Sequence, residues 1–268
     1  MCMNWLKESF GVNKPIIAMC HLQALPGDPS YNAEQGMERV IELARHDLKH
    51  LQDGGVDAVM FSNEFSLPYL TQVKTVTTAA MARVIGELKS EIRIPFGVNV
   101  LWDPIASIDL AAATGAGFIR EIITGVYASD FGLWNTNVGA TVRHKMALAP
   151  DLRMLYNIVP EAAAYLGNRN IVDIAKSTVF NNRPDALCVS GLTAGAETDT
   201  QVLSSVKKAV PNTVVLCNTG CRIDNVDRQL AVSDGAVVGS TFKIDGNFDN
   251  LVDPARVKAF MDKVKSLR

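Results

Sequence analysis

Short runs of apolar and β-branched residues alternate with helical patterns along the whole 268-residue chain. The clearest helical pattern covers 34–51, where Val40, Ile41, Ala44 and Leu48 recur at the spacing that places them on one helix face. An alternation of strands and helices indicates parallel strands joined by crossover helices. The order of elements therefore restricts the chain to the α/β folds.

The pattern predicts eight strands, each followed by a helix. Most of the strand runs are apolar on both faces, as strands buried between two layers must be. Eight such units in roughly 250 residues are typical of a closed (β/α)8 barrel and fit an open doubly wound sheet less well. We therefore expect a single (β/α)8 TIM barrel domain over residues 1–268. The expected strands are 15–20, 57–61, 95–100, 117–123, 152–158, 185–189, 213–217 and 235–238, and the expected helices are 34–51, 75–90, 104–113, 140–148, 171–180, 198–209, 223–231 and 254–266.

Charge and hydropathy exclude several functions. Lys and Arg number 26 against 28 Asp and Glu, and the net charge of −2 offers no basic field for nucleic acid. No apolar run approaches the roughly 20 residues that cross a bilayer. The first residues lack the basic flank and apolar block of a signal peptide. We expect no nucleic-acid partner, no membrane insertion and a cytoplasmic location.

Polar residues stand where the expected strands end, and in a barrel these positions face one shared cavity. Six strand ends carry donors, acceptors or titratable groups, which is more than core packing needs. The candidate catalytic residues are His21, Asn63, Glu64, Asn99, Arg120 and Asn157, together with Asp130 in the long loop after the fourth strand.

The alternation of side chains along a strand orients two of these candidates. Arg120 and Glu121 must face opposite ways, and a guanidinium inside a barrel needs an anion or a rim carboxylate. We therefore expect Arg120 to point inward and Glu121 to lie in the helix layer or at an interface. Asn99 also faces inward, either as a substrate contact or as a core amide bonded to a neighbouring strand. His21 titrates near neutral pH and suits acid–base work, although a histidine here could also cap a loop.

The sequence gives only a weak indication of a metal site. Glu64, Asp103 and Asp130 could hold Mg²⁺ or act as a general base, but no HExxH or DxDxDG spacing is present. We assign no metal ligands and no certain cofactor, and Mg²⁺ stays a candidate.

The ends of the last three strands are rich in small residues. Glycine lets a backbone approach an oxyanion closely, and barrels commonly bind phosphate at the loops after strands 7 and 8. Tight strand exits in any barrel also favour glycine, so this pattern alone leaves both explanations open. The candidate phosphate-binding residues are Gly191, Thr193, Gly220, Gly239 and Ser240.

The chain resembles the BtpA/SgcQ family over its full length. The resemblance rests on IAMCHL at 17–22, LPGDP at 25–29, FIR at 118–120, TGV at 124–126 and VVGSTFK at 237–243. It implies a phosphate-binding barrel used in carbohydrate metabolism, and it implies little about the reaction. The family takes its name from a role in photosystem I accumulation.

The chain departs from the family pattern in two places. Relatives tend to carry an acidic residue and a Lys-x-His stretch at the end of strand 5, where this chain has Asn157 and then Ile158 to Ala162. The end of strand 2, Ser62 to Ser66, is a variant of a Glu-Asn-Phe-Gly-Asp pattern, so Glu64 is displaced from the family acid. The resemblance therefore implies a different substrate or a lost activity.

Two hypotheses follow from the sequence. The first is an enzyme that acts on a small phosphorylated metabolite, a sugar phosphate or a nucleotide-derived sugar phosphate, by isomerisation, epimerisation, lyase or glycosyl-bond chemistry. The second is a non-catalytic assembly or regulatory factor.

Large apolar residues outside the predicted core could be buried in a homo-oligomer or could cover the barrel ends: Trp5, Phe10, Phe131 and Trp134.

Overall fold

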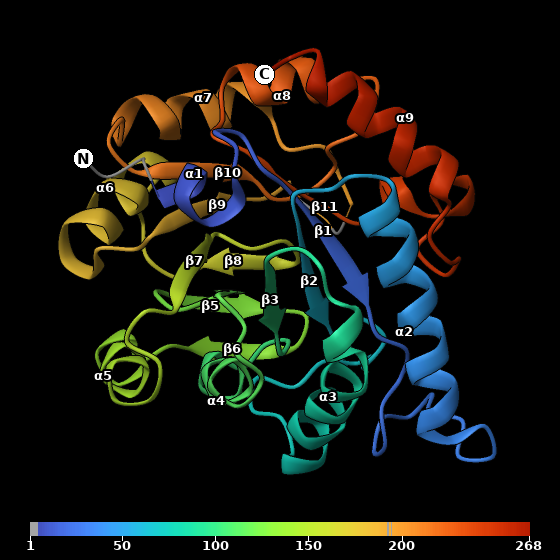
Figure 1. Cartoon of the computed structure of the whole chain (residues 1–268). Helices are drawn as coiled ribbons and strands as arrows, with labels where there is room; N and C mark the ends of the chain where they lie inside the picture. The colour runs from blue at the N-terminus through green and yellow to red at the C-terminus, as the bar shows by residue number, and fades with distance from the viewer. Residues whose placement is uncertain (1–4, 192, 194) are drawn as a thin grey trace.

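The computed structural model describes residues 5–191, 193 and 195–268. In this part of the chain, eight parallel strands close into a barrel in the order β1-β11-β10-β9-β7-β4-β3-β2 (Figure 1). The predicted (β/α)8 barrel is confirmed, and each predicted strand overlaps an observed one. The barrel strands are β1 (Ile16–His21), β2 (Ala58–Ser62), β3 (Phe96–Asn99), β4 (Phe118–Glu121), β7 (Arg153–Ile158), β9 (Ala186–Val189), β10 (Val214–Cys217) and β11 (Ala236–Val238).

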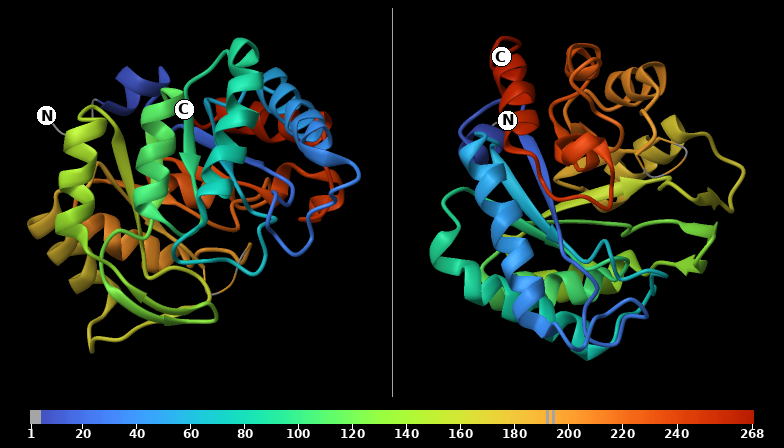
Figure 2. Two further views of the ribbon diagram at one scale, coloured as in Figure 1. Left: turned by 90° about the horizontal axis from the view of Figure 1, so that it is seen from below. Right: turned by 90° about the vertical axis from the view of Figure 1, so that its right-hand side faces the viewer.

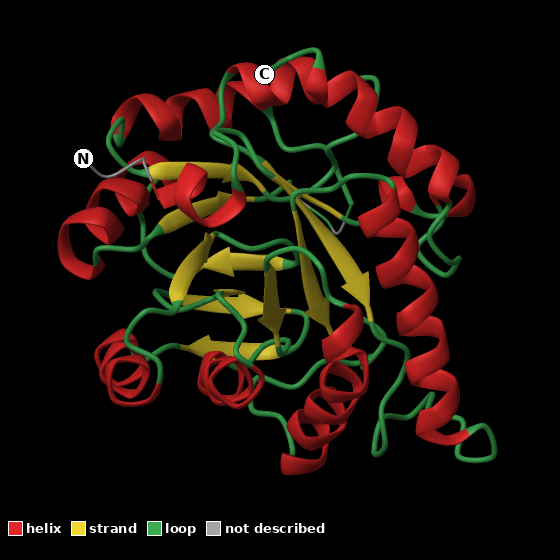
Figure 3. Ribbon diagram, viewed as in Figure 1, coloured by secondary structure: helices red, strands yellow, loops and turns green. Residues whose placement is uncertain are grey.

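Helices surround the barrel as an outer layer (Figure 3). None of the helices in the described ranges is long and apolar enough to span a membrane. The outer helices overlap the predicted ones: α2 (Gly36–Asp53), α3 (Thr75–Leu88), α4 (Pro104–Thr114), α5 (Val138–Leu148), α6 (Ile171–Asn182), α7 (Thr200–Ala209), α8 (Val226–Ala231) and α9 (Pro254–Lys265). Short 3-10 turns are η1 (Lys89–Glu91), η2 (Ser240–Phe242) and η3 (Ile244–Gly246).

The two-residue period of β1 explains how one strand serves two layers. Ile16, Ala18 and Cys20 pack in the core between the barrel and the helices. Ile17 and Met19 belong to a separate cluster inside the barrel. The next residue on the inward face is the last of the strand, and it is His21.

A helix that the sequence did not predict, α1 (Trp5–Phe10), closes the amino end of the barrel interior. Trp5 and Phe10 are both buried, and the Phe10 ring packs edge-on against Phe118 at 5.6 Å between centroids. Phe118 is the first residue of β4, so this contact lies at the start of the strands. Trp5 and Phe10 therefore cover a barrel end within this chain.

The loop after β4 also departs from the prediction. The sequence predicts only a long loop here, whereas β5 (Val126–Ser129) and β6 (Gly132–Asn135) form an antiparallel hairpin, which β8 (Ala163–Tyr165) extends into a second sheet. The right-hand view of Figure 2 shows the green hairpin projecting on the side away from the dark blue α1. Trp134 of β6 is buried in an aromatic cluster with Trp102 and Tyr127, so it too covers a barrel end.

Candidate functional site

Residues that follow the carboxyl ends of the strands line a cavity of about 790 Å³. Two groups of lining residues lie on different arcs of the barrel, because β10 and β11 are neighbours while β7, β4, β3 and β2 are consecutive on the other arc. We call the first group the basic wall: Arg222, Gly239, Ser240, Thr241 and Arg256. We call the second group the aromatic wall: Glu64, Tyr69, Trp102, Phe131 and Glu161.

His21 lines this cavity and is 7% exposed. Burial, followed by the positive charges of Lys243 and Arg120, holds its pKa well below the ordinary value. The imidazole is therefore neutral at pH 7, and its Nδ1 atom is buried without a hydrogen-bond partner among the described residues. A neutral imidazole on a cavity wall, with a ring nitrogen that has no hydrogen-bond partner, can accept a proton.

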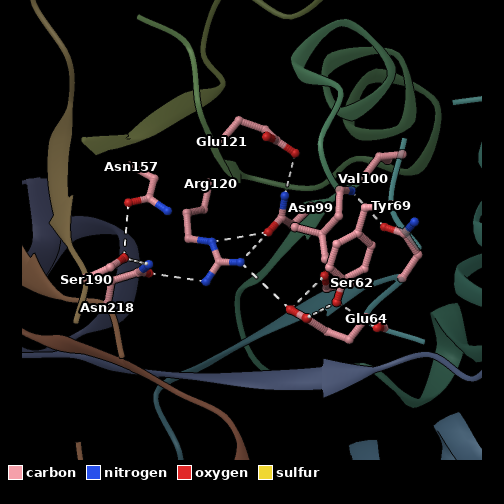
Figure 4. Close-up of polar contacts among 12 residues, drawn as sticks. Ser62, Glu64, Tyr69, Asn99, Val100, Arg120, Glu121, Asn157, Ser190 and Asn218 are labelled. Atoms are coloured by element: carbon pink, nitrogen blue, oxygen red, sulfur yellow. Dashed lines mark hydrogen bonds and ion pairs between the residues drawn. The ribbon is translucent and has the colours of Figure 1, made fainter. Parts of the chain in front are cut away.

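Arg120 points into the barrel, as predicted, and its guanidinium organises a polar layer beneath the cavity (Figure 4). Its Nη2 donates to Asn99 Oδ1 at 2.6 Å, and its Nη1 donates to Asn218 Oδ1 at 3.2 Å. The network continues from Asn218 Nδ2 to Ser190 Oγ and from Ser190 Oγ to Asn157 Oδ1. Arg120 is 4% exposed, so these bonds replace the water that a guanidinium needs.

Glu64 provides the carboxylate that faces Arg120, with 3.8 Å between Glu64 Oε1 and Arg120 Nη2. Tyr69 Oη donates to Glu64 Oε2 at 3.2 Å, and Ser62 Oγ donates to Oε1 at 3.3 Å. Burial raises the pKa of Glu64, and the nearby Arg120 charge opposes that shift only in part. The raised pKa favours the protonated carboxyl, which can act as a general acid.

The structure does not bring every candidate into the cavity. Asn99 and Asn157 are fully buried in the polar layer, and neither lines the cavity. Asn63 is 1% exposed, and its Oδ1 accepts a hydrogen bond from the Leu101 backbone N–H at 2.7 Å, next to the aromatic wall. Asp130 is exposed at the turn between β5 and β6. Three candidates therefore position other groups, and Asp130 lies outside the site.

Two further carboxylates have structural partners. Glu121 lies in the helix layer, as expected, where Ser107 Oγ of α4 donates to its Oε1 at 3.2 Å. The same oxygen accepts from Asn99 Nδ2 at 2.5 Å, and burial raises the pKa of Glu121 well above its ordinary value. Asp103 is the N-cap of α4 and accepts from the backbone N–H groups of Ile105 and Ala106.

The five expected phosphate-binding residues divide into two groups. Gly220, Gly239 and Ser240 line the cavity, whereas Gly191 and Thr193 do not. The N–H of Gly191 donates to Thr219 Oγ1 at 2.6 Å, so it is used within the protein. A Cβ atom at Gly239 would lie 3.1 Å from the His21 ring, so glycine there permits the close approach of β11 to His21.

Sequence reasoning missed two cations of the basic wall. Arg222 follows β10 and donates to the Gly195 carbonyl at 3.1 Å, and Arg256 in the first turn of α9 donates to the Thr241 carbonyl at 3.0 Å. Neither arginine forms an ion pair with any of the described residues, although Asp224 and Asp245 also line this side. The signal that could have found Arg256 is a guanidinium in the first turn of the last helix, which follows the final strand of the barrel after two short 3-10 turns.

No group of three or more potential metal-ligating side chains occurs in the described ranges. Glu64 and Glu161 are the carboxylates on the aromatic wall, and Arg120 lies against the first of them. The residues that line the cavity include an imidazole, two carboxyl groups on the aromatic wall and two rim arginines.

The fold and this cavity define a (β/α)8 barrel of the kind that places its site at the carboxyl ends of the strands. Residues 12–266 match the model of the BtpA family, and the chain belongs to that family. It is 66% identical over 267 residues to the "Putative sgc region protein SgcQ" of Escherichia coli K12, covering 99% of this chain and 100% of that protein. It is 30% identical over 260 residues to the "Photosystem I biogenesis protein BtpA" of Synechocystis sp. PCC 6803, covering 96% and 90%.

Solved structures share the fold at low sequence identity. Phosphoribosyl anthranilate isomerase from Thermus thermophilus superposes with a TM-score of 0.58 at 11% identity, covering 95% of this chain and 100% of that one. A Schiff-base-forming fructose-1,6-bisphosphate aldolase superposes with a TM-score of 0.52 at 15% identity, covering 98% and 99%. These likenesses extend to the barrel architecture alone.

Proposed function

We propose that this protein is an enzyme that transfers protons on a small phosphorylated metabolite, a sugar phosphate or a nucleotide-derived sugar phosphate. Isomerisation, epimerisation, aldol cleavage and glycosyl-bond cleavage all use this chemistry. The observation that carries the proposal is one cavity with two rim arginines on one side and a neutral imidazole, a buried guanidinium and a carboxyl group within it.

The basic wall supports binding of the phosphate group. Arg222 and Arg256 each keep N–H donors beyond the single backbone carbonyl that they bind. The backbone at Gly239 and Ser240 lies in the same wall, at the position where barrels commonly hold phosphate. Two of the solved structures with this fold are, by their descriptions, an isomerase of a phosphoribosyl compound and an aldolase of a bisphosphate, which agrees with this substrate class.

The proposed roles of the other residues follow from their charge states. His21 accepts a proton from a substrate carbon or hydroxyl, because its pKa is held below the working pH. Glu64 donates a proton to a second atom of the substrate, because burial raises the pKa of its carboxyl group and so favours the protonated form. Arg120 stabilises the oxyanion that forms between the two steps, with Asn99 and Asn218 fixing its orientation.

Titration calorimetry with inorganic phosphate and ribose 5-phosphate tests the binding half of the proposal. Arg222→Ala and Arg256→Ala each remove a charge-assisted contact, and each should weaken both ligands by about tenfold, which is about 1.4 kcal/mol. Arg228→Ala is the matched control, because Arg228 lies exposed on α8 and does not line the cavity. Failure of the wild-type protein to bind any phosphorylated probe would contradict the proposal.

Proton transfer can be tested without knowing the product. Wild-type protein incubated in D₂O with ribose 5-phosphate, fructose 6-phosphate and glucose 6-phosphate should catalyse exchange of a carbon-bound proton, which ¹H NMR detects. His21→Gln should remove the exchange and keep the thermal melting temperature within a few degrees. Tight binding without exchange would favour the second candidate, a non-catalytic factor, which the description of the Synechocystis relative as a photosystem I biogenesis protein supports.

A further inference from the structure

Two polar atoms in the aromatic wall are buried and have no hydrogen-bond partner among the described residues: Glu161 Oε2 and Trp102 Nε1. Trp102 is 6% exposed, and both residues line the cavity. A buried polar atom without a partner costs free energy, so such atoms commonly mark a place where a ligand completes the bonding. A carboxylate oxygen accepts and an indole N–H donates, which together match a hydroxyl group.

The backbone around Glu161 is held in an unusual conformation. Val159 has φ +49° and Ala162 has φ +57°, in the left-handed region that residues other than glycine seldom adopt. Partners from the second sheet fix both ends of this turn: the Val159 N–H donates to Tyr127 Oη, and the Asp130 N–H donates to the Ala162 carbonyl. The turn places the Glu161 side chain at the cavity, on the same wall as Glu64, whose pKa its charge raises.

Aromatic rings flank these groups. Tyr69 packs edge-on against Trp102 at 6.0 Å and against Phe131 at 5.2 Å between ring centroids, and all three rings line the cavity. The C–H faces of a sugar ring pack against aromatic rings while its hydroxyl groups bond to carboxylates. The basic wall on the other arc of the barrel has no aromatic ring and instead carries two arginines, Gly239 and two hydroxyl side chains.

We propose that Glu161 and Trp102, with Tyr69 and Phe131, form a subsite for the hydroxyl groups and ring of a sugar, so that the substrate is a sugar phosphate that spans the cavity. Its phosphate lies at the basic wall and its polyhydroxylated part lies at the aromatic wall. This inference rests on the proposed function above. The volume of about 790 Å³ lies within the range of pockets that hold whole small-molecule ligands and exceeds what a phosphate group alone would fill.

Calorimetry with three sugar phosphates and inorganic phosphate separates the two subsites. The sugar phosphates are ribose 5-phosphate, fructose 6-phosphate and glucose 6-phosphate. Glu161→Gln keeps the shape of the side chain and removes its charge, and it should weaken the tightest sugar phosphate by about tenfold while inorganic phosphate changes less than twofold. Glu34→Gln, on an exposed segment outside the cavity, is the matched control and should change neither affinity.

Trp102→Phe is the second variant, because it keeps an aromatic ring and removes only the N–H donor. It should weaken the sugar phosphate by about threefold to tenfold and leave inorganic phosphate unchanged. Arg222→Ala should instead weaken both kinds of probe. Melting curves of each variant establish that the fold is retained before the affinities are compared.

Three results would contradict the proposed sugar subsite, and the last of them would also contradict the proposed function. If Glu161→Gln leaves the sugar phosphates unchanged, or weakens inorganic phosphate equally, the subsite is wrong while the phosphate site stands. The same holds if wild-type protein binds no sugar phosphate more tightly than inorganic phosphate. If it binds no phosphorylated probe at all, the proposed function and the subsite both fail.

Discussion

The two ends of the barrel interior show opposite solutions on the same strand. Phe118 and Arg120 are two residues apart on β4 and face the same way, yet Phe118 packs against Phe10 under the barrel while Arg120 binds Asn99 and Asn218 beneath the cavity. Helix α1 seals the first end with apolar side chains. The second end has a polar layer with a cavity above it, so apolar packing closes one end while polar side chains line the other.

The largest effect is expected at the closed end. Phe118→Ala removes a ring that is 2% exposed and leaves a void between β4 and α1, which should lower the free energy of unfolding by about 4 kcal/mol. Affinity for phosphorylated ligands should stay within about twofold. Urea unfolding and calorimetry measure the two quantities, and a parallel loss of affinity would show that the two ends are not independent.

Arg120→Met should affect both stability and binding. Removal of the buried guanidinium leaves two buried amide oxygens, on Asn99 and Asn218, without donors, which should cost about 3 kcal/mol of unfolding free energy. Ligand binding and proton exchange should both be lost. If Arg120→Met instead binds and turns over normally, the polar layer is a structural feature only.

At Gly239, the size and charge of a substituent should have separable effects. Gly239→Ala places a methyl group 3.1 Å from the His21 ring and should cost about 1 kcal/mol of stability. Gly239→Asp adds a negative charge to the basic wall and should weaken inorganic phosphate by at least about tenfold more than the alanine variant does. Equal affinities in the two variants would place the phosphate elsewhere.

The smallest effect is a pH dependence at His21. Because the pKa of His21 is lowered in the folded state, below about pH 6.5 the unfolded chain binds a proton there that the folded protein does not. Stability from this group is therefore present above pH 6.5 and is lost as the pH falls toward the folded pKa. Between pH 6.5 and 5.5, wild-type protein should lose about 1 kcal/mol more unfolding free energy than His21→Gln. Identical losses would mean that the folded and unfolded states bind this proton equally, so that folding does not lower the pKa of His21.

The barrel could be predicted because its signal is local. Each strand run is apolar on both faces and is followed by a helical pattern, so the order of elements determines the topology. The inward position of Arg120 and the outward position of Glu121 followed from the two-residue strand period alone. His21 reached the cavity for the same reason.

The features of the fold and the cavity that the sequence does not predict depend on contacts between segments far apart in the chain. The second sheet needs β8 to pair with β5, and no local pattern in 124–132 shows that partner. Helix α1 has six residues, too few for a helical period to stand out. Glu161 was read only as a departure from the family pattern, because its place in the cavity depends on the left-handed turn between Val159 and Ala162. Asn63 and Asn157 are predicted as catalytic candidates because the sequence shows which residues end a strand, not which of them a neighbour already binds.

A crystal structure with ribose 5-phosphate bound would show directly how the ligand is oriented between the basic wall and the aromatic wall. We expect the phosphate against Gly239, Ser240 and the two rim arginines, with the sugar carbons beside His21 and a hydroxyl group on Glu161. A phosphate bound at the aromatic wall, or a ligand found outside the cavity, would contradict it.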